Sequence, residues 1–451
     1  MSNGSLTELT ATCNLDNDLN SRISLFNYNY NNKKYSKYSK MDYIFYPTGN
    51  ANWENTIRFT LTNKGDLLYG LYLVVKLPKL SIENLNINPK PNEYNTDSNY
   101  RVKYTDYIGG AIINKISLYI NGQLIDEQYG DYIQLYIDLY MSDINRKIML
   151  GLDSILNKPN LKIESEYIYI PLKFWFCLDN EKPLPIIALQ NSEIYIDIKF
   201  NRFSDCISIL ENNQVNNKLY HTNYKHKEVP LEDVHLLANF YFVEANERIK
   251  LASQEYIIPI IQSQVRSTLV SSSITSLDLD FNHVVKDIIF FIQPVNNKIY
   301  GEYFNFSAKM KYLPLELYNK DINIKLWDFE PSRHLLSRAR ILFNGTERIQ
   351  WRDYKYFNFV ENHENYKSNL RNLYIYMYSF NINPTKNTNF IGCDFSRIDN
   401  AQLQIEIKPN NFILDKLQSI SYPSDKYEIK CYATNFNILI IKNGIAALKY
   451  N

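Results

Sequence analysis

One pattern occurs twice in this chain, about half the chain apart, and it limits the folds that the chain can adopt. The first copy, Ile116–Tyr132, reads ISLYINGQLIDEQYGDY, and the second, Ala339–Tyr354, reads ARILFNGTERIQWRDY. In each copy a β-favouring run reaches Asn-Gly, and a polar stretch with Asp-Tyr follows about ten residues later. The repeat indicates two domains of similar build in tandem.

The Asn-Gly dipeptides at Asn121-Gly122 and Asn344-Gly345 predict a two-residue β-hairpin in each copy. Both central positions of a type I′ turn need positive φ, and Asn and Gly tolerate this best. We therefore expect these four residues to set the register of the two hairpins.

A second repeated pattern follows each copy. The segments Glu193–Phe200 (EIYIDIKF) and Gln402–Lys408 (QLQIEIK) alternate apolar and polar side chains. This period is typical of a strand with one buried face. The second copy is shorter between its markers, so the first domain is expected to carry longer loops.

Length and composition agree with an all-β chain of two domains. At 451 residues the chain is too long for one ordinary core, and its 45% hydrophobic and 14% aromatic content suits two antiparallel sandwiches. We predict an N-terminal arm over residues 1–24, a first sandwich over 25–243, a linker over 244–254 and a second sandwich over 255–451. The linker, EANERIKLASQ, is charged and favours a helix.

Local patterns predict elements of the first domain. The runs Thr56–Thr62, Leu67–Leu77 and Tyr167–Cys177 read as strands, and Pro78 ends the second of them. The segment Tyr129–Met141 has apolar residues at three-to-four spacing, which predicts a short amphipathic helix.

Two polar stretches, 79–104 and 201–230, are predicted to be long surface loops because they are rich in Asn, Pro and charged residues. Loops of this length are uncommon in a compact domain unless they serve a function. We expect them to lie at the periphery of the fold, where length can vary without disturbing the cores.

The formal net charge of +1 provides no long-range attraction for nucleic acid or an anionic membrane. The N-terminal residues lack the basic and apolar regions of a secretory signal, and no apolar run is long enough to span a bilayer. The five cysteines are scattered and odd in number, which indicates a reducing compartment and free thiols.

Little in the sequence points to catalysis. With 13 glycines, the chain has no phosphate-binding glycine-rich loop. The close pair His221 and His226 lies in a polar stretch, where solvated side chains are expected rather than a metal site. Asp278 and Asp280 share one face of an alternating strand, which is normally the wet face. We predict no enzyme, no cofactor and no metal site.

The same segments resemble a known family. The stretches Tyr107–Tyr136, which contains the first hairpin, and Tyr169–Phe200 (YIPLKFWFCLDNEKPLPIIALQNSEIYIDIKF) resemble the major capsid proteins of nucleocytoplasmic large DNA viruses. Further matching blocks follow in the family's order, so that the resemblance spans about residues 22–441. The N-terminal arm departs most from the family pattern.

The resemblance implies a double jelly roll, that is, two eight-stranded sandwiches side by side. It also implies a homotrimeric, pseudo-hexagonal capsomer that tiles an icosahedral shell. The implied partners are neighbouring capsomers and minor capsid and penton proteins, with no direct nucleic acid contact, and with membrane contact only through other proteins. The implied location is the virion, and the host cytoplasm or virus factory during assembly.

Two further groups of residues carry structural expectations from the resemblance. Phe174, Trp175 and Phe176 are expected to pack the first sandwich and its neighbour interface. The turn into a late strand of the second domain is expected at Phe395, Ser396, Arg397, Asp399 and Asn400. Arg397 and Asp399 either form an ion pair that fixes this turn or are both solvated.

One alternative keeps the fold but changes the role. A capsid paralog that serves as an assembly scaffold or a minor capsid protein would share the double jelly roll and the trimer. It would be scarce in, or absent from, purified particles, and sequence does not separate it from the main shell protein.

A second alternative is a carbohydrate-binding or carbohydrate-hydrolysing β-sandwich protein, which the 38 tyrosines would permit. Glycan binding by the isolated protein would favour this alternative.

Overall fold

The computed structural model describes residues 38–62, 64–86, 99–140, 154–213, 218–222, 226–270, 272–307, 311–312, 334–366, 374–385, 391–408 and 427–450. The predicted N-terminal arm, residues 1–24, lies outside the described residues. Parts of the two predicted loops do as well, at 87–98, 214–217 and 223–225.

The first sandwich consists of two antiparallel four-stranded sheets. In strand order, the first sheet contains β1 (Tyr38–Phe45), β13 (Asp233–Val243), β3 (Leu67–Leu77) and β9 (Glu166–Pro171). The second sheet contains β2 (Thr56–Leu61), β10 (Ile194–Phe200), β6 (Ile113–Ile120) and β7 (Gln123–Tyr129). The predicted strands Thr56–Thr62 and Leu67–Leu77 are β2 and β3, whereas β9 ends at Pro171 and the predicted strand to Cys177 is wrong. Residues 175–178 form the short helix α6 instead.

The second sandwich repeats this arrangement. Its first sheet contains β14 (Tyr256–Leu269), β22 (Tyr427–Lys442), β16 (Val284–Pro294) and β19 (Ile375–Ser379), with β20 (Cys393–Asp394) on β16 and β23 (Ile445–Leu448) on β22. Its second sheet contains β15 (Ile274–Asp278), β21 (Ala401–Ile407), β17 (Leu336–Phe343) and β18 (Thr346–Asp353). The prediction of two tandem eight-stranded sandwiches, a double jelly roll, is confirmed.

The two halves match strand by strand. Reading each sheet across, β1, β13, β3 and β9 take the places that β14, β22, β16 and β19 take in the second sandwich. The strands β2, β10, β6 and β7 correspond likewise to β15, β21, β17 and β18. The order along the chain is also the same, so each of these eight strands has an equivalent in the other sandwich.

Alternating side chains build the two cores. In β10, for example, Ile194, Ile196 and Ile198 are buried while Tyr195 and Asp197 lie on the outer face. The inward residues of the first sandwich form one large apolar cluster, and those of the second form another. Burial of each such side chain is worth about 1.5–3 kcal/mol, which makes these cores the main source of stability.

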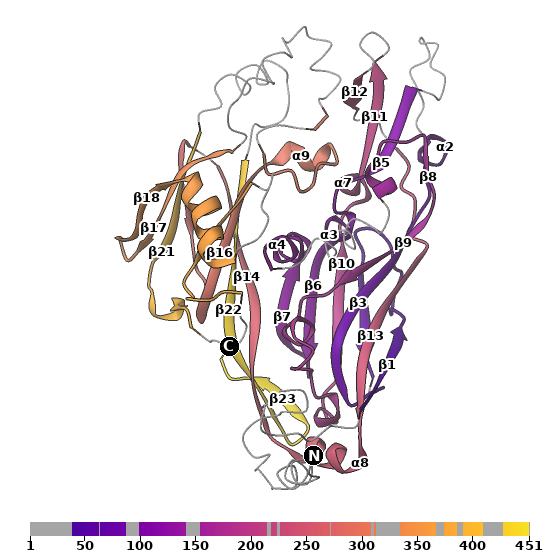
Figure 1. Cartoon of the computed structure of the whole chain (residues 1–451). Coiled ribbons are helices and arrows are strands. Elements are labelled where there is room, and N and C mark those ends of the chain that lie inside the picture. Colours follow the sequence, from indigo (N-terminus) through magenta and orange to yellow (C-terminus); the bar gives the residue numbers. More distant parts are fainter. Residues whose placement is uncertain are drawn as a thin grey trace, which may run out of the picture.

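The two stretches predicted to be loops contain regular structure. Within 79–104 lie β4 (Leu80–Ser81), α2 (Ile82–Leu85) and β5 (Tyr100–Tyr104), and within 201–230 lie α7 (Phe203–Cys206), β11 (Ile207–Asn213) and β12 (Lys218–His221). A small sheet of order β12-β11-β5 forms, and β4 pairs with β8 (Lys162–Ile163). These elements stand at one end of the first sandwich (Figure 1). The loop prediction was wrong because the strands pair over long sequence distances, which local composition does not reveal.

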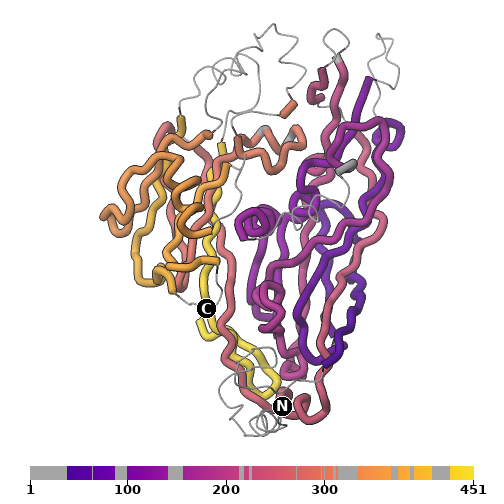
Figure 2. The backbone as a smooth tube through the Cα atoms, in the orientation of Figure 1, coloured from indigo at the N-terminus to yellow at the C-terminus, as the bar shows by residue number. Residues whose placement is uncertain are grey.

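Two helices connect the sandwiches. The helix α8 (Ala245–Ser253) occupies the predicted linker, with Glu244 and Gln254 as its caps. The helix α4 (Gly130–Tyr140) follows β7 and lies between the two sandwiches, whose long axes run side by side (Figures 1 and 2). The predicted helix over 129–141 is thus confirmed.

The remaining helices are short. The α-helices are α3 (Ile108–Ala111), α6 (Trp175–Leu178) and α9 (Val295–Ile299). The 3-10 helices are η2 (Ser154–Asn157), η3 (Ile186–Ala188) and η7 (Phe395–Arg397), and the π-helices are η5 (Tyr356–Val360) and η6 (Asn362–Tyr366). No helix among the described residues is both long and apolar enough to cross a membrane.

Candidate functional site at the junction of the two sandwiches

Both predicted Asn-Gly pairs lie at hairpin tips with positive φ. Asn121 and Gly122 have φ values of 52° and 75° between β6 and β7, and Asn344 and Gly345 have 48° and 79° between β17 and β18. Each turn also forms a hydrogen bond with the residue just before the neighbouring strand in the sheet. The Asn121 amide donates to Glu193 O at 2.8 Å, and the Asn344 amide donates to Asn400 O at 2.7 Å.

Replacing Gly122 by valine is expected to destabilise the protein by about 1–3 kcal/mol, because a β-branched residue resists positive φ. A Cβ at this position would meet no atom within 4 Å, so the cost comes from the backbone alone. We expect the melting temperature to fall by several degrees. Gly122→Asn, which tolerates the same φ, is the control. An unchanged melting temperature and expression for Gly122→Val would contradict the hairpin role.

The sequence holds a third Asn-Gly turn that the sequence analysis missed. Asn443 and Gly444, with φ values of 54° and 80°, join β22 to β23. The signal was the same dipeptide between two apolar runs. This third hairpin contacts the first sandwich, since the Ser192 hydroxyl and the Asn191 amide donate to Gly444 O at 3.0 and 3.1 Å. Close by, the Leu448 amide donates to Gln123 Oε1 at 3.1 Å.

Phe174, Trp175 and Phe176 lie in the core of the first sandwich. Their exposed fractions are 0%, 6% and 0%, and the Trp175 and Phe176 rings meet edge-to-face at 5.0 Å. The short helix α6 that carries them packs against β3 and against β14 of the second sandwich. These aromatics therefore fill the interior of one chain and offer almost no surface to another copy.

The turn motif at residues 395–400 leads into β21, as expected. Phe395 is buried and packs against Phe343 and Phe380, with ring centroids 5.5 Å apart in each pair. The Ser396 hydroxyl accepts from the His283 amide at 2.7 Å, so the motif also fixes the start of β16. The Asn400 amide donates to Asn344 Oδ1 at 2.9 Å, which joins two of the predicted groups.

Of the two alternatives for Arg397 and Asp399, the ion pair between them is not formed: Asp399 is exposed, and Arg397 pairs with Asp394 instead. Arg397 Nε lies 3.0 Å from Asp394 Oδ2, because the 3-10 turn places the side chains three residues apart on one side. The Arg397 side chain is 86% exposed, so the pair contributes little to stability.

The junction between the sandwiches is centred on α4, and this helix packs against both of them. Ile133 and Ile137 belong to the core of the first sandwich. The opposite side of α4 packs against the outer face of the sheet β14-β22-β16-β19. A third apolar cluster, separate from the two sandwich cores, contains Tyr132, Leu135, Tyr136 and Leu139 of α4 with Ile289, Phe291, Ile375, Met377 and Tyr432 of the sheet. Both sandwiches are thereby held in one arrangement by buried apolar surface.

A buried ion pair crosses the same junction. Lys430 Nζ of β22 lies 2.8 Å from Asp131 Oδ2 of α4, and the Tyr432 hydroxyl donates to the same oxygen at 3.3 Å. Burial alone would raise the pKa of Asp131, but the positive charges of Lys430 and Lys298 outweigh it and hold this pKa below its usual value. Both carboxylate and ammonium are therefore charged inside the junction.

Asp126 of β7 forms a second polar link to the other sandwich. Its carboxylate accepts from the Ser263 amide of β14 at 3.0 Å and from Gln128 Nε2 at 2.8 Å. Burial raises the pKa of Asp126 to about 7, from an ordinary 3.8, against the opposing effect of these hydrogen bonds. The carboxyl group therefore titrates near neutral pH.

Asp126→Asn is expected to stabilise the protein increasingly as the pH rises from about 5 to about 8. Because the folded-state pKa of Asp126 is raised, the contribution of Asp126 to the free energy of unfolding is largest below pH 3.8. This contribution is lost as the pH rises through about 7. The asparagine does not titrate and can still accept from the Ser263 amide. The variant should gain on the order of 2 kcal/mol over the wild type across this range. A pH-independent difference in melting temperature would contradict this.

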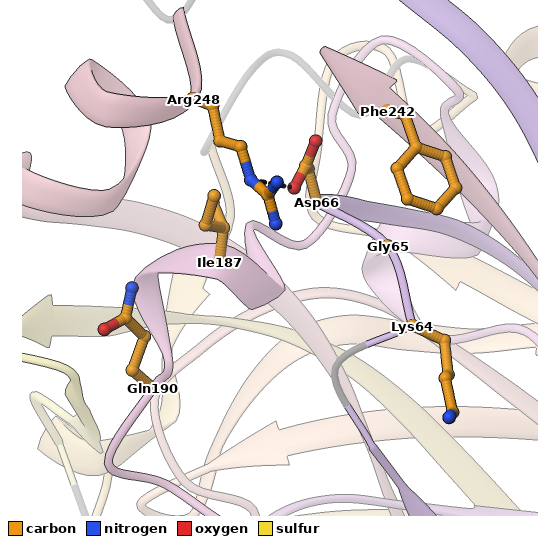
Figure 3. A pocket seen from close by; sticks show the side chains of 7 residues that line it. All are labelled: Lys64, Gly65, Asp66, Ile187, Gln190, Phe242 and Arg248. Carbon is orange, nitrogen blue, oxygen red and sulfur yellow. Dashed lines mark ion pairs between the residues drawn. The ribbon is translucent and has the colours of Figure 1, made fainter. Parts of the chain in front are cut away.

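The linker helix α8 is fastened to the first sandwich at a small pocket (Figure 3). Arg248 Nε lies 3.0 Å from Asp66 Oδ1, and the Val243 amide donates to Asp66 Oδ2 at 3.0 Å. The Asp66 side chain is 2% exposed. The pocket of about 350 Å³ is lined by Lys64, Gly65, Asp66, Ile187, Gln190, Phe242 and Arg248. Because a buried carboxylate needs its partner, Arg248 fixes the direction in which the chain leaves β13.

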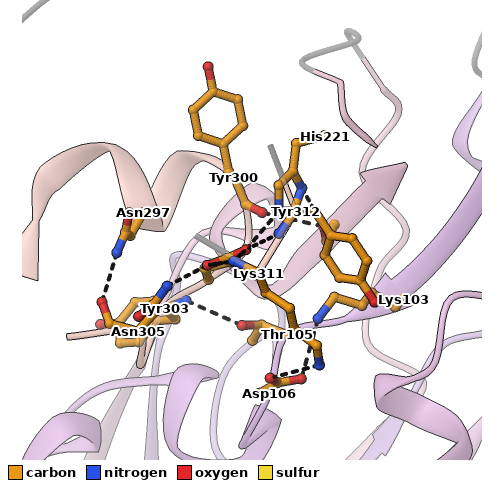
Figure 4. A network of polar contacts seen from close by, with 12 residues as sticks. Lys103, Thr105, Asp106, His221, Asn297, Tyr300, Tyr303, Asn305, Lys311 and Tyr312 are labelled. Carbon is orange, nitrogen blue, oxygen red and sulfur yellow. Dashed lines mark hydrogen bonds and ion pairs between the residues drawn. The ribbon is translucent and has the colours of Figure 1, made fainter. Parts of the chain in front are cut away.

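A polar network joins the sandwiches at their other end (Figure 4). His221 was predicted to be solvated, but it is 2% exposed, and its Nε2 lies 3.0 Å from Glu302 Oε1. The other ring nitrogen lies 3.0 Å from Ser208 Oγ. Glu302 also accepts from the backbone amides of Lys311 and Tyr312 at 2.8 and 3.1 Å. Burial lowers the pKa of His221, so the imidazole is neutral here.

The remaining candidates for chemistry lie apart. His226 packs its ring against Phe203 instead of joining His221. Asp278 and Asp280 are exposed, and Asp278 accepts from Gln402 Nε2 at 3.0 Å. Among the described residues no group of three or more His, Cys, Asp or Glu is placed to hold a metal ion. The contacts of the junction hold the two sandwiches together.

Comparison with known proteins gives consistent results along most of the chain. Residues 24–244 match the family model described as major capsid protein N-terminus, and residues 247–447 match that of the large eukaryotic DNA virus major capsid protein. The chain is 22% identical to a major capsid protein of Phaeocystis pouchetii virus over an alignment of 497 residues, covering 89% of this chain and 91% of that protein. It is 24% identical to the major capsid protein of Paramecium bursaria Chlorella virus 1, covering 77% and 80%.

Solved structures share the fold. A chain in a quasi-atomic model of the PBCV-1 virus capsid superposes with a TM-score of 0.68 at 20% identity, covering 93% of this chain and 98% of that one. The Faustovirus major capsid protein superposes with a TM-score of 0.67 at 13% identity, covering 97% of both. At these identities the likeness concerns the double jelly roll itself.

Proposed function

From the premise that this chain belongs to the family of major capsid proteins of large eukaryotic DNA viruses, we propose that three copies of it form one pseudo-hexagonal capsomer. Such capsomers would tile the faces of an icosahedral shell. The protein would then act as the repeating structural unit of the virion and not as an enzyme.

The observation that supports this proposal most directly is the equivalence of the two sandwiches. Both have the same order of eight strands along the chain and across their sheets. Three copies of a chain with two similar lobes present six similar lobes around one axis. A ring of this kind approaches six-fold symmetry while its true symmetry is three-fold, and a hexagonal outline covers a flat face without gaps.

The equivalence of the two sandwiches also divides the chain into two lobes and a linker. We propose that residues 25–243 and 255–451 act as the two lobes and that 244–254, which contains α8, acts as the linker. The ion pair of Arg248 with Asp66 supports this because it fastens the linker to the first lobe. The proposed partners are neighbouring capsomers and the minor capsid and penton proteins. Assembly would take place in the host cytoplasm or the virus factory.

The solution mass tests the proposal. Light scattering after size exclusion should give about 160 kDa, three times the chain mass of 53.3 kDa. Electron microscopy of concentrated samples should then show hexagonal arrays. A purified protein that stays at 53.3 kDa at all concentrations would overturn the capsomer proposal. A trimer that is present in purified particles only in traces would favour the minor capsid or scaffold role.

A further inference from the structure

The first sandwich leaves one aromatic sheet face exposed. We call it the open face, and it is the outer side of the sheet β1-β13-β3-β9. It contains Ile44, Tyr72, Tyr167, Tyr169 and Leu237. The side chains of Ile44, Tyr167 and Tyr169 are 42%, 41% and 40% exposed. Neighbouring large apolar side chains exposed to this extent indicate a contact surface.

The equivalent face of the second sandwich is covered within the same chain. The outer residues of the sheet β14-β22-β16-β19 include Ile289, Phe291, Ile375 and Tyr432, which are at most 1% exposed. The helix α4 covers them with one side (Figure 1). Aligning β3 with β16, both eleven residues long, places Tyr72 at the position of Ile289. The two faces thus correspond in position, and among the described residues α4 covers only the face of the second sandwich.

The element that corresponds to α4 lies in the second sandwich. α4 follows β7, and the π-helices η5 and η6 follow β18, the equivalent strand. In both places one side of the helical segment enters its own core, through Ile133 in α4 and Phe357 in η5. The other side of α4 is buried against the neighbouring sandwich. In η5, by contrast, Phe359 and Val360 are 53% and 40% exposed.

We propose that the exposed side of η5 in one copy packs on the open face of the next copy, repeating between chains the contact that α4 makes within the chain. The inference rests on the proposed trimer and specifies its interface. Phe359 and Val360 of one copy would lie against Tyr72, Tyr169 and Leu237 of its neighbour. The contact is head-to-tail, and three such contacts close a ring in which all six lobe junctions are alike.

The charges of the two surfaces suit this contact. Within the chain, Asp131 is the second residue after β7 and pairs with Lys430 of the facing sheet. In the second sandwich the second residue after β18 is Lys355, which is exposed. In the alignment of β3 with β16, the position of Lys430 is taken on the open face by His235, whose Nδ1 lies 3.1 Å from Asp233 Oδ2. The open face carries both signs, with Asp42 and Asp233 beside Lys40 and Lys76, and Lys355 would approach the carboxylate of Asp233 next to His235.

Substitution of either surface tests the proposal. Phe359→Asp and Tyr169→Asp should each convert the protein from about 160 kDa to the 53.3 kDa monomer in light scattering. Both side chains are partly exposed in the single chain, so the melting temperature and circular dichroism of the monomer should show a folded protein. Ile382→Asp, at a residue 74% exposed elsewhere in the second sandwich, is the matched control and should remain trimeric.

The outcomes separate this inference from the proposed function. If the wild type is a trimer and both aspartate variants are trimers as well, the inferred interface is overturned while the capsomer proposal stands. If the wild type is a monomer, the proposed function fails first.

A disulfide test gives the direction of the contact. Chains that carry both Phe359→Cys and Tyr169→Cys should form covalent trimers under oxidation, seen on a non-reducing gel. An equal mixture of the two single variants should form covalent dimers and no covalent trimers, because each chain carries one introduced cysteine and one disulfide uses it up. Cross-linking within either single variant alone, at the level of the mixture, would overturn the head-to-tail arrangement.

Discussion

Gly130→Ala is expected to abolish soluble expression of the folded protein. Gly130 is the first residue of α4, where the helix leaves β7 and passes close to α3. A Cβ at this position would lie 2.0 Å from Gly110 O and 2.4 Å from Ile113 O. Both atoms belong to the backbone of neighbouring elements, so neither can move away by changing a side-chain rotamer. We expect a loss of about 4 kcal/mol or more.

The matched control is Gly122→Ala, at a hairpin tip where a Cβ would meet nothing within 4 Å. It should cost only about 1 kcal/mol, the strain of alanine at positive φ. Soluble yield and melting temperature of the two variants measure the difference. A Gly130→Ala protein that expresses and melts like Gly122→Ala would show that α4 can shift relative to α3, contrary to the close packing described above.

Lys430→Ala should be the next most damaging single change, with a loss of about 3–5 kcal/mol. The substitution leaves the Asp131 carboxylate buried in the junction without its closest positive charge, at a position only 4% exposed. Urea denaturation with the wild type as reference measures the loss.

The double variant Asp131→Asn with Lys430→Met separates the cost of an unpaired charge from the cost of lost packing. It removes both charges and keeps similar volumes, so it should recover most of the stability lost in Lys430→Ala. If the single variant loses less than about 1 kcal/mol, water reaches Asp131 in the junction and the ion pair is not a structural link.

Much of the fold follows from local sequence patterns, because jelly-roll strands are short and one side of each is buried. The alternation in 193–200 and 402–408 predicts β10 and β21, and the Asn-Gly pairs predict two hairpins at positions where the backbone needs positive φ. The helix-favouring linker predicts α8. In each case the information lies within about ten residues of the element.

The predictions fail where a contact with a residue far away in the sequence determines the local structure. The run Lys173–Cys177 is apolar like a strand, yet it turns into α6 because the aromatics must fill the core above β3 and reach β14. The strand β11 lies in a polar stretch and pairs with β5, about a hundred residues earlier, while β12 pairs with β11. His221 is polar in a polar stretch, and only the fold brings Glu302 to it.

The junction itself was beyond the reach of sequence patterns. The helix α4 has the three-to-four spacing of an amphipathic helix, which predicts one buried side and one wet side. In the structure every residue from Gly130 to Leu139 is buried, because one sandwich packs on each side of the helix. The residues Asp131 and Lys430 are 299 positions apart, and nothing local marks them as a pair.

The third hairpin, Asn443-Gly444, determines when one contact between the two lobes can form during synthesis of the chain. Its glycine carbonyl is the acceptor for Ser192, which is synthesised 252 residues earlier. At a typical elongation rate of about 5–20 residues per second, the first lobe emerges and folds roughly 10–50 seconds before this contact becomes possible. A nascent chain that stops short of Gly444 therefore carries a complete first lobe whose polar groups at 191–192 still lack their partners. The polar groups at 191–192 therefore acquire these partners only after Gly444 has been synthesised.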